Sequence, residues 1–283
     1  MTGEMQIRTM NIREVAEAVD MAAAEGWNPG LQDAGCFAFV DRSGFWGGWI
    51  DGRLVATISV VNYGDGFAFL GFYIVAPAWR GQGLGLRLWN AALEHAGDRV
   101  VGLDGVVDQQ ENYRRSGFEL AWRNIRYQGV PRAVEGGEPG LVLEIVASPD
   151  AGIEALDRSV FPAARTGFWR DWLGAPGHLS IRARRRTETV AFGTLRPCRE
   201  GYKVGPLVAN SDGAARVVLA RLMEAQPEGA EMVLDVPEPN APGVALAREL
   251  GLEPVFETAR MYRGAAPELD VARIFGVTTF ELG

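Results

Sequence analysis

Residues 80–85 read Arg80-Gly81-Gln82-Gly83-Leu84-Gly85 and have the residue types of a phosphate-binding loop. They follow an apolar run that ends in Ile74-Val75-Ala76-Pro77, and an apolar stripe with helical spacing begins at Leu84. Glycines allow positive φ and a close approach of the backbone to a ligand, while the free N–H groups and dipole of a helix N-terminus favour an anion. Arg80 adds a fixed positive charge. We therefore expect this strand-to-helix turn to bind a phosphate group.

Two common phosphate loops do not fit this spacing. A P-loop requires GxxxxGK[ST], and a dinucleotide fingerprint requires GxGxxG. The segment here has the spacing Arg-x-x-Gly-x-Gly instead. One structural alternative stays open, in which the glycines serve only a tight turn between the strand and the helix.

The hydrophobic pattern around the loop predicts the elements that position it. From the N-terminus it predicts a strand from Ile7, a helix over 12–24, and then an antiparallel meander. The meander strands are expected at 37–40, 45–50, 54–61 and 67–75. A helix through Leu84 and Leu88 follows the loop, and then a strand at 100–107, a short helix at 109–115 and a strand at 120–127.

Residues 130–140 combine prolines, glycines and charges, which is typical of a linker. The chain beyond them repeats the order of elements. Strands are expected at 141–146, 179–183, 190–196, 202–208, 232–236 and 259–262, with helices at 151–160, 214–225 and 244–250. We therefore predict a duplicated α/β (α+β) fold with domains at 1–129 and 141–283.

Composition excludes several classes of function. The net charge of −8 and the pI of about 5.0 argue against nucleic acid, anionic membranes and other polyanions as partners. Two cysteines without a CxxC pair and only two histidines predict neither a disulfide framework nor a metal site. The pattern shows no signal peptide or membrane span, so we expect a soluble cytoplasmic protein. No feature predicts an oligomeric state.

The Arg-x-x-Gly-x-Gly spacing, after a strand that ends in Val-x-Pro, resembles the GCN5-related N-acetyltransferase (GNAT) family. Arg80, Gly83 and Gly85 match its pattern Arg/Gln-x-x-Gly-x-Gly/Ala, and the element order of residues 1 to about 129 matches its fold. The resemblance implies domains with a mixed, mostly antiparallel sheet flanked by helices. It also implies acetyl-CoA as cosubstrate, bound by Ile74, Val75, Arg80, Gly81, Gln82, Gly83, Leu84, Gly85, Asn112 and Tyr113.

A second motif strengthens the resemblance. Many family members have Tyr-x-x-x-Gly-Phe where this chain has Tyr113 and Gly117-Phe118, and their tyrosine can protonate the leaving thiolate of CoA. A phenol with a pKa near ~10 stays protonated at neutral pH, which suits an acid. The alternative is that Tyr113 only packs its ring beneath the sheet. Relatives often have Asn at the position of Val106, so Gln109 or Asn112 is the expected substitute.

The resemblance implies direct transfer of the acetyl group, with the carbonyl polarised by a backbone N–H near Val75. An alkylammonium acceptor must first lose a proton, so a base is needed. Asp104, which interrupts an apolar strand, is the first candidate, and Asp108 is the second. A structural hydrogen bond to a neighbouring loop is an equal reading of Asp104.

The acceptor pocket of this family is usually walled by the region that corresponds to residues 27–33. Trp27 is expected to stack on a substrate and Asp33 to hold a cation, although a packed tryptophan at a helix end is an alternative for Trp27. The chain has Ala247 where Tyr113 has its counterpart, and residues 204–210 lack the glycine loop. The second half thus resembles the degenerate C-terminal domain of tandem members, and we expect it to shape the acceptor site.

The leading interpretation is an N-acetyltransferase that acts on a small amine. A non-catalytic sensor of acyl-CoA is the main alternative. Acyl transfer to a hydroxyl or to a protein lysine also stays open.

Overall fold

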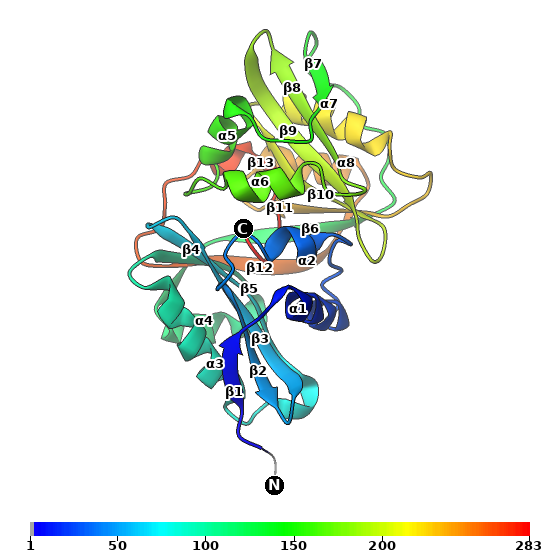
Figure 1. The fold of residues 1–283 in the computed structure, drawn as a ribbon. Helices are drawn as coiled ribbons and strands as arrows, with labels where there is room; N and C mark the ends of the chain where they lie inside the picture. The colour runs from blue at the N-terminus through cyan, green and yellow to red at the C-terminus, as the bar shows by residue number, and fades with distance from the viewer. Residues whose placement is uncertain (1–2) are drawn as a thin grey trace.

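The computed structural model describes residues 3–283, which form one thirteen-stranded sheet with helices on both faces (Figure 1). The strands of the first half are β1 (Gln6–Thr9), β2 (Phe45–Ile50), β3 (Arg53–Tyr63), β4 (Phe67–Val75), β5 (Val100–Val106) and β6 (Phe118–Gly129). Its helices are α1 (Ile12–Ala24), α2 (Asp33–Phe37), α3 (Leu84–Leu93) and α4 (Gln110–Arg115). Short 3-10 turns precede α3, follow it and precede α4, at Pro77–Trp79, Glu94–Ala96 and Val107–Gln109.

The second half repeats this order. Its strands are β7 (Val142–Ile145), β8 (Leu179–Arg185), β9 (Glu188–Pro197), β10 (Tyr202–Ala209), β11 (Met232–Pro237) and β12 (Glu253–Arg263). Its helices are α5 (Ala151–Arg158), α6 (Thr166–Trp172), α7 (Asp212–Met223) and α8 (Ala241–Glu249). A 3-10 turn (Val271–Arg273) leads into a short additional strand, β13 (Ile274–Gly276). Within the described chain, residues 130–141 contain no helix or strand.

The two halves exchange their last strands. The order across the sheet is β1-β2-β3-β4-β5-β12-β6-β11-β10-β9-β8-β7, and β13 pairs with β10. β12 of the second half therefore lies between β5 and β6, and β6 of the first half lies beside β11 (Figure 1). Adjacent strands are antiparallel except for the parallel pairs β4–β5 and β10–β11. The predicted mixed, mostly antiparallel fold is confirmed, but the two halves share one sheet.

A buried ion pair joins each exchanged strand to its neighbour. Arg260 of β12 lies opposite Asp104 of β5, with Nε 2.8 Å from Oδ1 and an Nη 2.6 Å from Oδ2. Arg126 of β6 lies opposite Asp235 of β11 at 2.7 and 2.8 Å. The side chains of both pairs are at most 7% exposed. The same bidentate contact thus joins the two halves twice.

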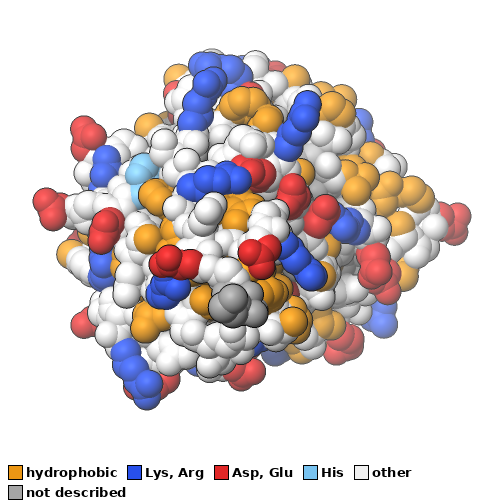
Figure 2. All heavy atoms as spheres, turned by 60° about the horizontal axis from the view of Figure 1, so that its bottom comes forward, with side chains coloured by type: hydrophobic (Ala, Val, Ile, Leu, Met, Phe, Trp, Pro, Cys, Tyr) orange, Lys and Arg blue, Asp and Glu red, His pale blue; other side chains and the backbone are white. Residues whose placement is uncertain are grey.

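The helices form two layers. α1, α2, α5 and α6 pack on one face of the sheet and share a single core across the two halves. Phe37 of α2 stacks on Trp172 of α6 with ring centroids 6.1 Å apart. α3 packs on the other face in the first half, and α7 and α8 pack in the second half. On the face shown in Figure 2, acidic and basic side chains are interspersed.

Most predicted elements occur within a few residues of their expected bounds, but the strand expected at 37–40 is wrong. Phe37 ends α2, and a turn follows it. Asp33, Cys36 and Phe37 are the buried residues of α2, a spacing of three and four residues that belongs to a helix face. The short run Phe37 to Val40 was too brief for its apolar residues to distinguish a strand from a helix end. Helix α6 and strand β13 were not predicted.

The strand exchange makes a strong prediction about truncation. A fragment of residues 1–129 lacks β12, so β5 and β6 lose their common neighbour and Asp104 loses Arg260. We expect this fragment to show no cooperative thermal transition by circular dichroism, because unpaired strands and an unpaired buried charge are both destabilising.

A chain broken only within 130–140, with both pieces co-expressed, is the matched control because it retains every strand. It should form a stable complex. A soluble 1–129 fragment that unfolds cooperatively by itself would contradict the importance of the exchange.

Candidate active site

A cleft opens where β4 and β5 separate. The two parallel strands pair from Phe67 and Val100 to Leu70 and Leu103, and the pairing then stops. β4 carries a bulge at this point, since its register against β3 shifts and Phe72 has φ of 49°. A left-handed conformation is unusual for a bulky residue and is often found at functional sites. The bulge turns the end of β4 away from β5.

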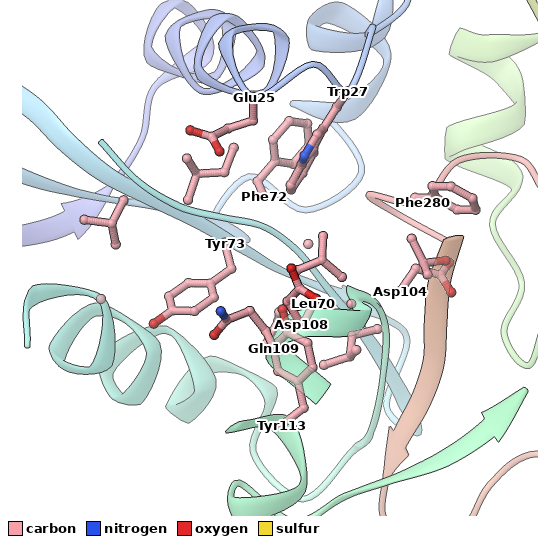
Figure 3. Close-up of a pocket in the computed structure, with 18 of the residues that line it drawn as sticks. Glu25, Trp27, Leu70, Phe72, Tyr73, Asp104, Asp108, Gln109, Tyr113 and Phe280 are labelled. Atoms are coloured by element: carbon pink, nitrogen blue, oxygen red, sulfur yellow. The ribbon is translucent and has the colours of Figure 1, made fainter. Parts of the chain in front are cut away.

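The cleft has a volume of about 620 Å³, which is in the range of small-molecule sites. Figure 3 shows Tyr73 of β4 and Tyr113 of α4 on the side of α3 and α4, with Trp27 and Phe72 on the side of α1. The glycine loop contributes Gly81, Gly83, Leu84 and Gly85 to the lining. The second half contributes Phe256, Thr258, Phe280 and Glu281 to the rest.

Three glycines of the loop have distinct structural roles. Gly81 and Gly83 have φ of 75° and 74°, a region that favours glycine. Gly83 is also the N-cap of α3, so the first turn of this helix begins at the cleft. A Cβ on Gly85 would lie 2.6 Å from the Tyr73 hydroxyl and 2.9 Å from a Val75 methyl group. The glycines therefore form the turn and also let α3 pack closely on β4.

Arg80 fixes the loop to both neighbouring elements. Its Nε donates to the carbonyl oxygen of Val75 at 2.8 Å, and its guanidinium pairs with Glu25 at the end of α1. The arginine side chain is still 50% exposed. Its charge therefore stays at the rim of the cleft, where the loop lies.

The structure brings most of the predicted cofactor residues together. Those that line the cleft are Ile74, Val75, Arg80, Gly81, Gly83, Leu84, Gly85 and Tyr113. Gln82 and Asn112 do not line it. Gln82 donates to the Ala78 carbonyl oxygen at 3.3 Å, and Asn112 donates to Gln109 Oε1 at 2.7 Å. Gln109 itself lines the cleft, so Asn112 contacts a lining residue without lining the cleft itself.

Tyr113 is held tightly by packing. Its ring stacks on Trp89 of α3 at 5.8 Å and 21°, and a Cβ at Gly105 would collide with it. The residue is 7% exposed and lines the cleft. Burial raises the pKa of Tyr113 above that of an ordinary phenol. Tyr113 is therefore both a packed core residue and a protonated hydroxyl at the cleft.

Asp104 is better explained as a structural residue than as a base. Both of its carboxylate oxygens accept from Arg260, and Oδ1 also accepts from Asn124 at 2.7 Å. Its side chain is fully buried. Burial lowers the pKa of Arg260, but the Asp104 carboxylate and the Tyr262 hydroxyl together raise it above its usual value. The predicted structural partner exists, although it is an exchanged strand and not a neighbouring loop.

The two residues predicted to contact the acceptor lie in different surroundings. Trp27 lines the cleft beside Phe72, with ring centroids 6.4 Å apart (Figure 3). Asp33 does not line it and is 1% exposed. Its carboxylate lies 3.2 Å from Arg196 Nε and accepts from the Gly30 N–H at 2.7 Å. Asp33 therefore holds a cation, but this cation is a buried arginine of β9.

The second half has no comparable opening at the equivalent position. β10 and β11 pair only from Tyr202 and Met232 to Val204 and Leu234. β13 then pairs with β10, and the N–H of Val277 donates to the Asp235 carbonyl oxygen at 2.8 Å. The chain itself thus fills the space between these parallel strands.

The linker, residues 130–140, covers the N-terminus of α7, the helix that corresponds to α3. Glu138 accepts from the hydroxyl of Ser211, the N-cap of α7, at 2.8 Å. Its N–H donates to the Gly213 carbonyl oxygen at 3.2 Å. A carboxylate of this chain therefore lies at the helix N-terminus that corresponds to the loop end of α3.

Within 3–283, no group of three or more His, Cys, Asp or Glu side chains is placed to hold a metal ion. No helix in the same part of the chain is long and apolar enough to cross a membrane.

Comparisons with known proteins agree with this geometry. A model of the acetyltransferase (GNAT) family matches residues 12–118, and a model of an acetyltransferase (GNAT) domain matches residues 153–276. A relative named holothin acyltransferase, from Pseudoalteromonas sp. (strain SANK 73390), is 32% identical over 264 residues. The match covers 93% of this chain and 90% of the relative.

Solved structures show the same fold. A putative acetyltransferase from Pyrococcus horikoshii is 21% identical with a TM-score of 0.82, and the match covers 99% of this chain and 96% of that one. A tandem GNAT protein from the clavulanic acid biosynthesis pathway is 16% identical with a TM-score of 0.64. That match covers 93% of this chain and 100% of the other.

The assignment of Asp104 predicts the effect of its replacement. Asp104→Asn leaves Arg260 buried without a countercharge, so the free energy of unfolding should fall by about 3–5 kcal/mol. Asp235→Asn should have a similar effect through Arg126. Urea denaturation measures both.

Glu257→Gln is the control, because Glu257 is on the same strand β12 but 49% exposed, 3.6 Å from Arg123. Its replacement should cost at most about 1 kcal/mol. Asp104→Asn with unchanged stability would contradict the structural role.

Proposed function

Because the chain belongs to the GNAT family of acyltransferases, we propose that it transfers the acetyl group of acetyl-CoA directly to a small amine. Members of this family use acyl-CoA as the donor. The observation that carries the proposal is that the glycine loop and the Tyr113 hydroxyl belong to one cleft, at the separation of β4 and β5.

The shape of the cleft supports the orientation of the donor. The pyrophosphate is proposed to bind at the turn of Gly81 and Gly83, where positive φ angles and the start of α3 favour an anion. The pantetheine arm then follows the end of β4 at Ile74 and Val75, whose edge toward β5 is unpaired. This path brings the thioester to the bulge at Phe72.

The chemistry needs no covalent intermediate on the protein. The amine nitrogen attacks the thioester carbon, and the C–S bond breaks as the C–N bond is formed. Tyr113 donates its proton to the departing sulfur. The raised pKa of Tyr113 suits this role, because the hydroxyl stays protonated over the whole neutral range.

The walls beyond the bulge favour an acceptor with an apolar body. Trp27, Phe72, Phe256 and Phe280 line this part of the cleft. Aromatic rings of this kind pack on flat or apolar ligands and also on cations. The 32% identical relative is named for acyl transfer to holothin, so holothin is the first acceptor to assay.

Release of free CoA tests the proposal. The purified full-length chain is incubated with acetyl-CoA and, in turn, with holothin, benzylamine, spermidine and a lysine-containing peptide. We expect release with at least one small amine, no release with the peptide, and a slower reaction with longer acyl donors. Tight binding of acetyl-CoA without turnover of any amine would favour a sensor instead.

Tyr113→Phe tests the acid. The variant should lower kcat by about 100-fold or more, because proton transfer to the leaving group is lost. Its affinity for acetyl-CoA should change little, since the packing of the ring on Trp89 is retained. Stopped-flow turnover and calorimetric binding separate the two effects.

Tyr202→Phe, on β10 and outside the cleft lining, is the matched control and should leave kcat unchanged. The wild-type rate should not fall with rising pH at least up to ~10, because Tyr113 ionises above the usual phenol pKa. A Tyr113→Phe variant that turns over like the wild type would exclude Tyr113 as the acid.

A further inference from the structure

The proposed reaction needs a base, and four carboxylates line the cleft: Glu25, Asp104, Asp108 and Glu281. Glu25 pairs with Arg80. Asp104 is occupied by Arg260 and Asn124. Asp108 is exposed to solvent. Glu281, close to the C-terminus, is neither exposed like Asp108 nor held in an ion pair like Glu25 and Asp104.

Glu281 lies at the point where β4 leaves β5. The last parallel pair is Leu70 with Leu103, and Gly71 is the next residue of β4. A Cβ on Gly71 would collide with the backbone carbonyl oxygen of Glu281, so the two segments are in direct contact. Glu281 is 5% exposed, and its carboxylate makes no hydrogen bond within residues 3–283. Glu281 is thus a buried acidic residue that lines the cleft, and its backbone contacts β4 at the point where this strand leaves β5.

The charges around Glu281 come from four elements. Lys203 of β10, Arg126 of β6 and Arg196 of β9 face it, as does Asp33 of α2. Each cation is engaged elsewhere: Arg126 pairs with Asp235, Arg196 lies beside Asp33, and Lys203 Nζ donates to the Trp27 carbonyl oxygen at 3.0 Å. With Asp235, the partner of Arg126, the cluster contains three acidic side chains and three basic ones. The cluster therefore has no net charge when Glu281 is ionised and all three basic side chains are protonated.

Burial dominates the protonation equilibria of this group. It raises the pKa of Glu281, although Lys203, Arg126 and Arg196 oppose the effect. Burial, together with the neighbouring Arg126, lowers the pKa of Lys203 to about 8. An ionised carboxylate with a raised pKa is a stronger base than an exposed glutamate.

We propose that Glu281 is the general base of this acyl transfer, placed by the C-terminal segment of the second half at the point where β4 and β5 separate. The assignment rests on the proposed function. It also gives the second half a direct chemical role, since the acid comes from α4 and the base from a segment that follows β13.

Glu281 takes one proton from the acceptor ammonium, and the free amine attacks the thioester carbon. As the C–N bond is formed, the C–S bond breaks and Tyr113 protonates the sulfur. The second nitrogen proton replaces the one lost by Tyr113 through solvent, and Glu281 releases its proton to water. The products are the amide, free CoA and one proton.

The test compares Glu281→Gln with the wild type, using the small amine of the panel that is acetylated fastest. At neutral pH the variant should lose about 100-fold in kcat. The deficit should shrink as pH rises, because more of the amine then arrives unprotonated. The fall of the wild-type kcat at acidic pH, with an apparent pKa above the usual ~4.3 of glutamate, should be absent from the variant.

Two further variants separate chemistry from folding. Glu281→Asp keeps a carboxylate and should recover part of the rate together with the acidic fall. Glu268→Gln removes an exposed carboxylate of the same C-terminal region and should leave the rate unchanged. Thermal melting and calorimetric binding of acetyl-CoA accompany each variant.

The outcomes distinguish the two proposals. If the wild type acetylates no small amine, the proposed function fails and this assignment fails with it. If the wild type is active and Glu281→Gln keeps both its rate and its pH profile, only the assignment of Glu281 is overturned. A loss of rate that is the same at every pH, and that Glu281→Asp does not relieve, would also overturn it in favour of a structural role.

Discussion

Two buried ion pairs, Arg260 with Asp104 and Arg126 with Asp235, determine how the strands of this protein are arranged. Burial of four charges is unfavourable unless each is paired with good geometry, and both pairs here are bidentate. A slip of one residue would move each side chain to the opposite face of the sheet and leave its partner alone. The pairs therefore favour one register, in which β12 joins β5 and β6 joins β11.

This arrangement makes the active cleft a product of both halves. β12 brings Phe256 and Thr258 to the cleft, and the chain beyond it returns to place Phe280 and Glu281 there. The same C-terminal segment fills the space between β10 and β11 through β13. One segment thus blocks the equivalent opening of the second half and lines the opening of the first. A nearly symmetric sheet therefore carries an open cleft in the first half and a filled one in the second.

Local features of the sequence predicted the loop and most elements well. The helical spacing after Asn11 and the apolar run before Pro77 depend on neighbouring residues, so α1 and β4 have the expected bounds. The turn roles of Gly81 and Gly83 were also readable, because a positive φ depends on the local backbone, whereas the packing of Gly85 against Tyr73 and Val75 was not. Asp104 stood out as a charge in an apolar strand, but its partner is 156 residues away. Sequence spacing carries no information about such a contact.

The other wrong or missing predictions also depend on contacts between residues that are far apart in the sequence. Glu281 follows β13 in a segment without periodicity, and only the return of the chain to Gly71 gives it a place in the site. Asp33 was expected at the acceptor, but Arg196 of the second half draws it into the interior.

The central claim is that this chain has one donor site, at the separation of β4 and β5, and that its own residues occupy the equivalent position in the second half. Calorimetric titration of the full-length chain with acetyl-CoA tests this most directly. The account predicts a single class of site with one acetyl-CoA bound per chain. Two bound molecules per chain, or none, would contradict it.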